Sequence, residues 1–189
     1  MSYGLGVILG NNLKQQGFEK ITGADFLKGF EAIFSGADLE VGPEEANQLI
    51  QQHLASGIGK QNLDAGNAYL AKNGTRAEVT TLPSGLQYEI LTKGDGPKPQ
   101  ATDTVTTHYH GTLIDGTVFD SSVERNQPAS FPVNGVIQGW VEALQMMPVG
   151  SKWRLHVPSH LAYGDRGAGG AIGPNTTLIF DVELIKIGG

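Results

Sequence analysis

The chain has 189 residues, with 13 lysine and arginine side chains against 19 acidic ones and a formal net charge of −6. This length allows one full domain and a smaller one, or one large domain. The negative charge argues against general binding to nucleic-acid phosphates. The absence of cysteine excludes disulfides, thiolate nucleophiles and cysteine-bound metals. The sequence also lacks an apolar run near the roughly 18 residues that a membrane-spanning helix needs.

The N-terminus does not have the pattern of a secretory signal. Lys14 follows the first apolar stretch instead of preceding it, so no basic segment leads into an apolar one. We therefore expect a cytoplasmic protein, with a periplasmic or secreted form that has lost its signal as the alternative. Neither a nucleic acid nor a membrane is expected as a partner.

The N-terminal part of the chain has the pattern of three helices. The first is predicted over residues 2–16 and ends at Gly17, because glycine commonly follows the last residue of a helix. The second begins at Thr22, whose spacing from Asp25 indicates a capping box. Apolar residues then recur at helical spacing up to Gly36, which ends the second helix.

A third helix is predicted from Pro43, a favourable first-turn residue, to about Gly74. Gly57 and Gly59 weaken its middle by about 1 kcal/mol each. The first two helices present a wide apolar face that so short a segment cannot bury by itself. We expect a second copy of the chain to cover this face in a two-fold dimer, with packing inside one chain as the alternative.

From residue 84 the pattern changes to short strands and turns. Asp115 and Gly116 indicate a hairpin turn, and residues 136–146 indicate a short amphipathic helix that ends before Pro148. Apolar and polar residues alternate in several segments, as on half-buried strands. The clearest of these segments are 86–90, 105–109, 153–157 and 178–184.

These elements predict an α+β fold, in which an antiparallel β-sheet wraps around a short helix. An α-helical dimerisation domain with its linking helix is expected over residues 1–74. A linker follows at 75–83, and the sheet domain occupies residues 84–189.

Two histidines form the most metal-like feature of the sequence. His108 and His110 are two apart on a predicted strand, so their side chains point the same way. A zinc site needs a third ligand, for which His156 and His160 are candidates. We favour the alternative of two partly exposed sheet histidines, and we expect neither a metal nor a cofactor.

The sequence shows no sign of nucleophilic or phosphate chemistry. No G-x-S-x-G nucleophile pattern occurs. The glycines at residues 167–170 lack the lysine of a phosphate-binding loop and precede no helix.

The remaining aromatic and aliphatic residues could form an ordinary hydrophobic core, but many of them belong to five motifs with a recognisable order and spacing. They are residues 107–111 (THYHG), 115–122 (DGTVFDSS), 136–140 (VIQGW), 162–164 (AYG) and 178–184 (LIFDVEL). In order and spacing they resemble the FKBP family of peptidyl-prolyl cis–trans isomerases over about residues 84–187. Residues 2–6 (SYGLG) and 82–88 (LPSGLQY) are similar to the macrophage infectivity potentiator group of bacterial FKBPs, which are dimers through an N-terminal helical domain.

The resemblance implies an enzyme that rotates X-Pro bonds in unfolded or flexible protein chains and assists folding as a dimer. Amide rotation breaks no covalent bond, so the catalyst needs only to bind the twisted amide better than the planar forms. The implied catalytic residues are Tyr109, Phe119, Asp120, Trp140, Tyr163 and Phe180. The implied substrate- and inhibitor-binding residues are Arg125, Phe131, Val136, Ile137 and Ile172.

The implied ligands are proline-containing polypeptides and macrolide inhibitors such as tacrolimus or rapamycin. The sequence departs from the family pattern at Ala129 and at Ala168, Ala171 and residues 173–175 of the loop that is expected to cover the site. These departures keep a second hypothesis open, in which the FKBP fold serves as a holdase chaperone or interaction module with weak catalysis.

Overall fold

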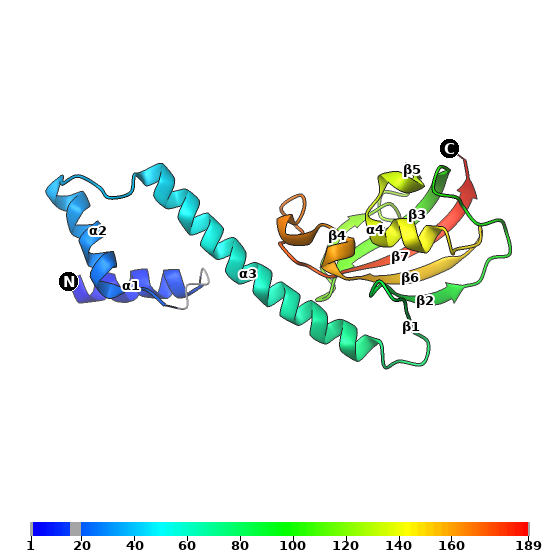
Figure 1. Cartoon of the computed structure of the whole chain (residues 1–189), viewed down its shortest axis with the longest axis horizontal. Helices are drawn as coiled ribbons and strands as arrows, with labels where there is room; N and C mark the ends of the chain where they lie inside the picture. The colour runs from blue at the N-terminus through cyan, green and yellow to red at the C-terminus, as the bar shows by residue number, and fades with distance from the viewer. Residues whose placement is uncertain (1, 16–19, 189) are drawn as a thin grey trace. The chain divides into compact units, whose positions relative to one another are not determined.

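The computed structural model describes residues 2–15 and 20–188 and divides the chain into two compact units, Met1–Ile58 and Gly59–Gly189. The division falls inside α3 (Pro43–Asn73), which Figure 1 shows as one continuous helix. The sequence places the domain boundary near residue 74 instead. In the structure, about four turns of α3 belong to the C-terminal unit.

The N-terminal unit consists of α1 (Ser2–Gln15), α2 (Gly23–Ser35) and the first half of α3. α2 ends at Gly36, which has a left-handed backbone conformation with φ of 69°, as a helix C-cap often does. Thr22 precedes α2 but makes no side-chain hydrogen bond to the helix, so the predicted capping box is absent. The predicted stop at Gly17 lies outside the described residues.

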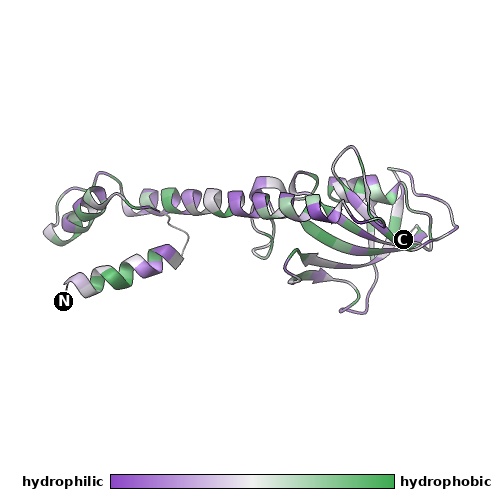
Figure 2. Cartoon of the chain, turned by 90° about the horizontal axis from the view of Figure 1, so that it is seen from below, coloured by the Kyte–Doolittle hydropathy of each residue, from purple (hydrophilic) through white to green (hydrophobic). Residues whose placement is uncertain are grey.

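The apolar residues of this unit are uncovered in the single chain. No described side chain between residues 2 and 58 is buried. Ile33 and Phe34 on α2 are 62% and 77% exposed, and Figure 2 shows hydrophobic residues along both α1 and α2. The rings of Phe26, Phe30 and Phe34 follow one another along α2, with centroids 6.4 and 4.8 Å apart. The wide apolar face predicted from the sequence is therefore present.

In the described part of the C-terminal unit, seven strands form one antiparallel sheet in the order β1-β2-β6-β7-β3-β4, with β5 also paired to β3. The strands are β1 (Thr80–Thr81), β2 (Gln87–Thr92), β3 (Thr104–Leu113), β4 (Val118–Ser121), β5 (Ala129–Pro132), β6 (Lys152–Val157) and β7 (Leu178–Ile187). With α4 (Gln138–Leu144) packed on the sheet, this confirms the predicted α+β fold (Figure 1).

Three single turns of 3₁₀ helix connect these elements. They are η1 (Val133–Gly135), η2 (Ser159–Leu161) and η3 (Gly164–Arg166). The predicted hairpin turn lies between β3 and β4, where Gly116 has a φ of 89° and its N–H donates to the carbonyl of Leu113.

The hydrophobic core lies between α4 and one face of the sheet. Side chains alternate along a strand, so Leu178, Phe180, Val182 and Leu184 of β7 all reach this core. They pack in one cluster with α4 residues that include Trp140. Burial of such side chains contributes about 1.5–3 kcal/mol each, which fixes the sheet and the helix together.

The second half of α3 packs on β2 and β6 through side chains that alternate with the core residues. The Tyr69 hydroxyl contacts Nδ1 of His156 at 2.8 Å, and Nδ2 of Asn73 donates to Oε1 of Gln87 at 2.9 Å. Nε2 of Gln87 in turn donates to the carbonyl of Leu70 at 2.9 Å. These residues of α3 are therefore a structural part of the sheet domain.

Candidate active site

The residues implied by the five motifs come together in a cavity of about 400 Å³ between α4, the sheet and the segment before η3. Of the implied site residues, Arg125 and Ile172 are outside its lining, and Gly135 is an addition to it. The cavity is lined by Tyr109, Phe119, Asp120, Phe131, Gly135, Val136, Ile137, Trp140, Tyr163 and Phe180.

Trp140 is the centre of an aromatic cluster in this cavity. The rings of Phe180, Tyr109 and Phe131 lie at 5.3, 5.6 and 6.1 Å from the Trp140 ring, each nearly perpendicular to it. Phe119 extends the cluster by an edge-to-face contact with Phe180 at 5.4 Å. Edge-to-face pairs contribute favourable free energy in addition to that of the apolar area they bury. The cluster therefore fixes the positions of the surrounding rings relative to the indole of Trp140.

Local backbone features bring these rings together. The hairpin after β3 returns the chain antiparallel as β4, which places Phe119 across from Phe180. Gly111 makes room for both rings, because a Cβ at this position would lie 2.6 Å from Cζ of Phe119 and 3.1 Å from Phe180. Gly135 has a comparable role beside α4, where a Cβ would lie 2.7 Å from Cγ of Pro132. The sequence alone does not indicate that a glycine is needed at these positions to make room for neighbouring side chains.

A hydrogen-bonded group of three polar side chains closes one side of the cavity. The Tyr109 hydroxyl donates to Oδ2 of Asp120 at 2.5 Å and accepts from Nη2 of Arg125 at 2.9 Å. Nη1 of Arg125 also pairs with Oδ1 of Asp120. Arg125 does not line the cavity, but it holds Tyr109 and Asp120, which do.

This arrangement changes the acidity of two of the three groups. Burial, together with the hydrogen bond to Asp120, raises the pKa of the Tyr109 hydroxyl. Burial also acts to raise the pKa of Asp120, but the hydrogen bonds from Tyr109 and Arg125 outweigh it and hold that pKa below its ordinary value. At neutral pH, Asp120 is thus a carboxylate and Tyr109 a neutral hydroxyl.

The loop at residues 165–175 differs from the expectation. Tyr163, which is 41% exposed, lines the cavity from just before η3, but no residue of 165–175 does. Ile172 is only 8% exposed and packs in the core, and its backbone forms a two-way bridge with Ala168. The structure therefore places Ile172 beside the site, outside the cavity, and the loop does not cover it.

The histidines of the sequence do not gather at one place. Nδ1 of His108 and Nδ1 of His110 each contact a serine hydroxyl, at 3.0 and 2.9 Å. His156 is bonded to Tyr69 under α3, and His160 contacts the carbonyl of Ser84. Among the described residues, no group of three or more histidine or acidic side chains could hold a metal ion.

Comparison with known proteins agrees with the site. The family model described as FKBP-type peptidyl-prolyl cis-trans isomerase matches residues 96–185, and the domain amino terminal to FKBP-type peptidyl-prolyl isomerase matches residues 1–90. The FKBP-type 22 kDa peptidyl-prolyl cis-trans isomerase of Escherichia coli K12 is 44% identical over 98% of this chain and 93% of its own length. The chain belongs to the FKBP-type peptidyl-prolyl cis–trans isomerases.

Other relatives of this FKBP are similar along the whole chain. The outer membrane protein MIP of Legionella longbeachae is 44% identical over 99% of this chain and 84% of its own length. The crystal structure of FkpA from Escherichia coli covers 98% of this chain and 94% of its own, at 36% identity and a TM-score of 0.71. The expected function, a peptidyl-prolyl cis–trans isomerase, and the resemblance to the infectivity potentiator group are confirmed.

These relatives give no support to the expected cytoplasmic location, since one of them is named an outer membrane protein. In the described ranges of this FKBP, no helix has both the length and the apolar character needed to cross a bilayer.

Proposed function

We propose that the aromatic cavity around Trp140 is the active site of this isomerase and that its substrates are X-Pro bonds in unfolded or flexible protein chains. The observation that carries this proposal is the convergence of rings from four strands and α4 on one open cavity. Proline is the apolar ring that such walls accept, and an open cavity admits it as part of a long chain.

Catalysis in this cavity follows from what an amide loses when it twists. Resonance sets a barrier of roughly 18–20 kcal/mol to rotation about the peptide bond. The twisted amide has less charge separation than the planar one, so apolar walls stabilise it relative to both planar isomers. We assign the floor under the proline ring to Trp140 and the walls to Tyr109, Phe119 and Phe180.

Polar groups at the edge of the cavity then hold the substrate backbone in register. The hydroxyl of Tyr163 and the backbone N–H of Ile137 are the donors that we assign to substrate carbonyls, since both residues line the cavity. Asp120, fixed by Tyr109 and Arg125, keeps the opposite edge ordered. Phe131 and Val136 complete the apolar lining.

The test is the cis-to-trans rate of a short Phe-Pro peptide with two tryptophan variants. Trp140→Leu is expected to lower kcat/KM by about tenfold or more, equivalent to about 1.4 kcal/mol of transition-state stabilisation. Trp153→Leu is the matched control, because Trp153 is buried but lies outside the cavity and stacks on Tyr88 at 4.4 Å. Equal loss of kcat/KM per folded molecule in both variants contradicts the assignment.

Tacrolimus and rapamycin are proposed inhibitors of this cavity, because a macrolide with a proline-like ring would occupy the floor at Trp140. Tacrolimus is expected to abolish the wild-type peptide rate. A rate that is unchanged at saturating drug, together with the expected loss in Trp140→Leu, would assign the activity to the cavity but exclude the drug from it.

We propose that the functional form of the protein is a homodimer whose interface is formed by residues 1–58. α1, α2 and the first half of α3, in which no described side chain is buried, leave an apolar surface that water disfavours. A second copy presents the same apolar surface, so a two-fold arrangement covers both at once.

Light scattering on the purified chain tests the dimer. Wild type is expected at twice the mass of one chain, and Phe34→Asp at the mass of one chain, because it introduces a charge on the apolar face of α2. Ser35→Asp adds the same charge at the next exposed position and is expected to remain dimeric. A wild-type protein that has the mass of one chain contradicts the proposal.

Assistance to protein folding is proposed to need both units. Two active sites in one dimer raise the effective concentration of a site for a bound client. Full-length protein is expected to accelerate refolding of a proline-limited protein more than residues 59–189 do, at equal peptide activity. Equal refolding rates contradict this proposal, whereas suppression of aggregation without any isomerase rate would favour the holdase alternative.

For the compartment, we propose the periplasmic or secreted alternative, because one relative is named an outer membrane protein. Fractionation of the source cells, with immunodetection of the chain in each fraction, tests it. Recovery in the cytoplasmic fraction alone contradicts this proposal.

A further inference from the structure

The segment at residues 173–177 leads into β7, and α3 holds it from the side. Nδ2 of Asn62 donates to the carbonyl of Pro174 at 2.8 Å and lies 3.2 Å from Oγ1 of Thr176. The N–H of Asn175 donates to the carbonyl of Gly164 at 2.7 Å. Gly164 directly follows Tyr163, whose side chain lines the cavity. Two hydrogen bonds and the peptide bond between Tyr163 and Gly164 therefore connect the Asn62 amide to Tyr163.

The fit between α3 and this segment is close on both sides of Asn62. A Cβ at Gly59 would lie 3.1 Å from Nδ2 of Asn175, and a Cβ at Gly66 would lie 2.3 Å from Oγ1 of Thr177. Gly59 and Gly66 are seven residues apart and therefore on the same side of the helix. At Gly66 the backbone of α3 thus approaches the segment more closely than a side chain would allow without a shift of Thr177, and at Gly59 a side chain would fit only tightly.

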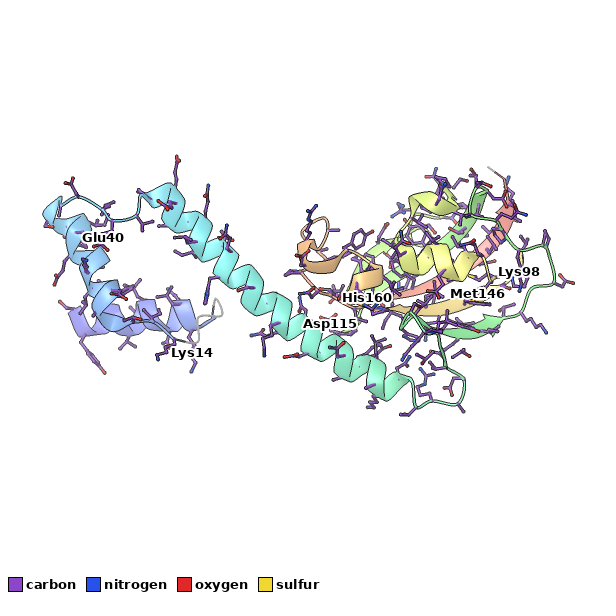
Figure 3. All side chains as sticks on the ribbon, viewed as in Figure 1. Lys14, Glu40, Lys98, Asp115, Met146 and His160 are labelled. Carbon is purple, nitrogen blue, oxygen red and sulfur yellow. The ribbon has the colours of Figure 1, made fainter. Side chains whose placement is uncertain are left out.

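Asn62 also faces the turn that leads into β4. Together with Asp115 and Thr177 it lines a small cavity of about 240 Å³. Figure 3 labels Asp115 beside α3, at the end of the hairpin whose second strand supplies Phe119 and Asp120. Asn62 therefore borders both residues 173–177 and the turn that leads to Phe119 and Asp120 of the active-site cavity.

From this geometry we infer that Asn62 is a positioning residue for the isomerase reaction. It holds residues 173–177 and, through the bond between Asn175 and Gly164, fixes the place of the Tyr163 hydroxyl at the cavity edge. The inference rests on the substrate contact that we propose for Tyr163. It makes α3 a contributor to catalysis, in addition to its connection with the N-terminal unit.

A donor held in place before the substrate arrives costs no ordering free energy in the transition state. When Asn62 cannot donate, the segment loses its hydrogen bonds to α3 and the Tyr163 hydroxyl is held less firmly. The effect is expected on kcat/KM for a short peptide, which needs no second unit and no protein client.

The experiment is a double-mutant cycle on the full-length protein, with Asn62→Asp, Tyr163→Phe and the two combined. Asn62→Asp keeps the shape of the side chain but removes the N–H donor. It is expected to lower kcat/KM about fivefold in the wild-type background and to have no effect in the Tyr163→Phe background, since coupled residues show non-additive losses. Lys60→Ala, which removes an exposed side chain of the same helical turn, is the control and is expected to retain wild-type kcat/KM.

Thermal melting of each variant separates positioning from unfolding, because the rates are compared only among variants that are folded at the assay temperature. If Asn62→Asp is unfolded there, Asn62→Ala replaces it in the cycle. Multiplicative losses in the double variant, or a folded Asn62 variant with full activity, overturn the inference and leave the proposed active site intact. Full activity of Tyr163→Phe overturns both the proposed contact and the inference.

Discussion

At the scale of single residues, the most consequential polar group outside the cavity is His156, which is 1% exposed beneath α3. Its Nε2 lies 2.9 Å from Oε1 of Glu89, and its Nδ1 lies 2.8 Å from the Tyr69 hydroxyl. In the neutral imidazole Nε2 carries the hydrogen and donates it in a hydrogen bond to Glu89, so Nδ1 accepts from the Tyr69 hydroxyl. Arg76 donates to both oxygens of Glu89, from Nη1 to Oε1 at 3.0 Å and from Nη2 to Oε2 at 2.9 Å, and completes the chain of contacts.

Burial lowers the pKa of His156 below its usual 6.5, although Glu89 acts in the opposite direction and Arg154 and Arg76 add to the lowering. As pH falls through about 6.5, the unfolded chain therefore takes up this proton before the folded protein does. The stability that the neutral imidazole provides is present above that pH and is lost as pH falls toward the folded-state pKa.

We predict that His156→Gln lowers the unfolding midpoint in urea at pH 7.5, because it breaks the contacts with Glu89 and Tyr69. The same variant is predicted to lose less stability than wild type between pH 7.5 and 5. Urea titrations at both pH values check this. A wild type and a variant with parallel pH dependence would show that other groups, not His156, cause the acid sensitivity.

The residues of the cavity were more predictable from the sequence than those beside it. Trp140, Phe119 and Phe180 belong to motifs that carry the resemblance to the FKBP family, and this resemblance, not strand or helix periodicity, implied that they share one site. Ile172 lies in a loop, where no periodic pattern indicates which way a side chain points, and the structure directs it into the core. Asn62 is more than 100 residues from its partners, so no local pattern could have indicated its contacts.

At the scale of elements, α3 shows why glycine in a helix has two opposite meanings. The sequence treats Gly57 and Gly59 alike, as residues that weaken the helix. In the structure a Cβ at Gly57 would meet nothing within 4 Å, whereas Gly59 and Gly66 face the segment at residues 173–177. Helix propensity sets the effect at the first position, and packing against that segment sets it at the other two.

Two alanine variants separate these effects. Gly57→Ala is predicted to stabilise the protein by up to about 1 kcal/mol, the difference in helix propensity. Gly66→Ala gains the same propensity but is predicted to destabilise by about 1–3 kcal/mol net, as overpacking does. Denaturant unfolding of both variants checks the signs, and a Gly66→Ala protein as stable as Gly57→Ala contradicts the close packing of α3.

The short strands were harder to predict than the helices and the long strands. β5 is four residues long and ends in Pro132, and it is a strand only because Phe131 pairs with Val105 of β3. The predicted helix at residues 136–146 is shorter in the structure, at Gln138–Leu144. For β5 a partner from elsewhere in the chain sets the boundary, which the local pattern does not contain.

At the scale of the whole molecule, the alternation of apolar residues and the two glycine-bounded helices were enough to predict an α+β fold with a helical segment before it. The boundary was not predictable in the same way. Composition changes near residue 75, where the helix ends, but the compact unit begins at Gly59 because α3 packs on the sheet there. The boundary between the two compact units therefore lies inside α3, whose sequence shows no change of pattern at that point.

Two truncations test where the catalytic unit begins. Residues 59–189 are predicted to keep the wild-type peptide rate. Residues 75–189 lack the partners of His156, Gln87 and Pro174 and are predicted to be about 2–4 kcal/mol less stable, at roughly 1 kcal/mol for each lost hydrogen bond. Thermal and urea unfolding of both fragments, with the Phe-Pro assay, check this. Equal stability of the two would place the boundary at residue 74 after all.

The positions of the two tryptophans allow binding in the cavity to be followed by intrinsic tryptophan fluorescence. Trp140 lines the cavity, whereas Trp153 stacks on Tyr88 outside it, and the chain has no third indole. Replacing Trp153 with phenylalanine would leave one tryptophan beside the five tyrosines, so emission excited selectively in the indole would report on the cavity. A proline peptide or a macrolide that enters the cavity would then change the colour and intensity of that emission, without any attached dye.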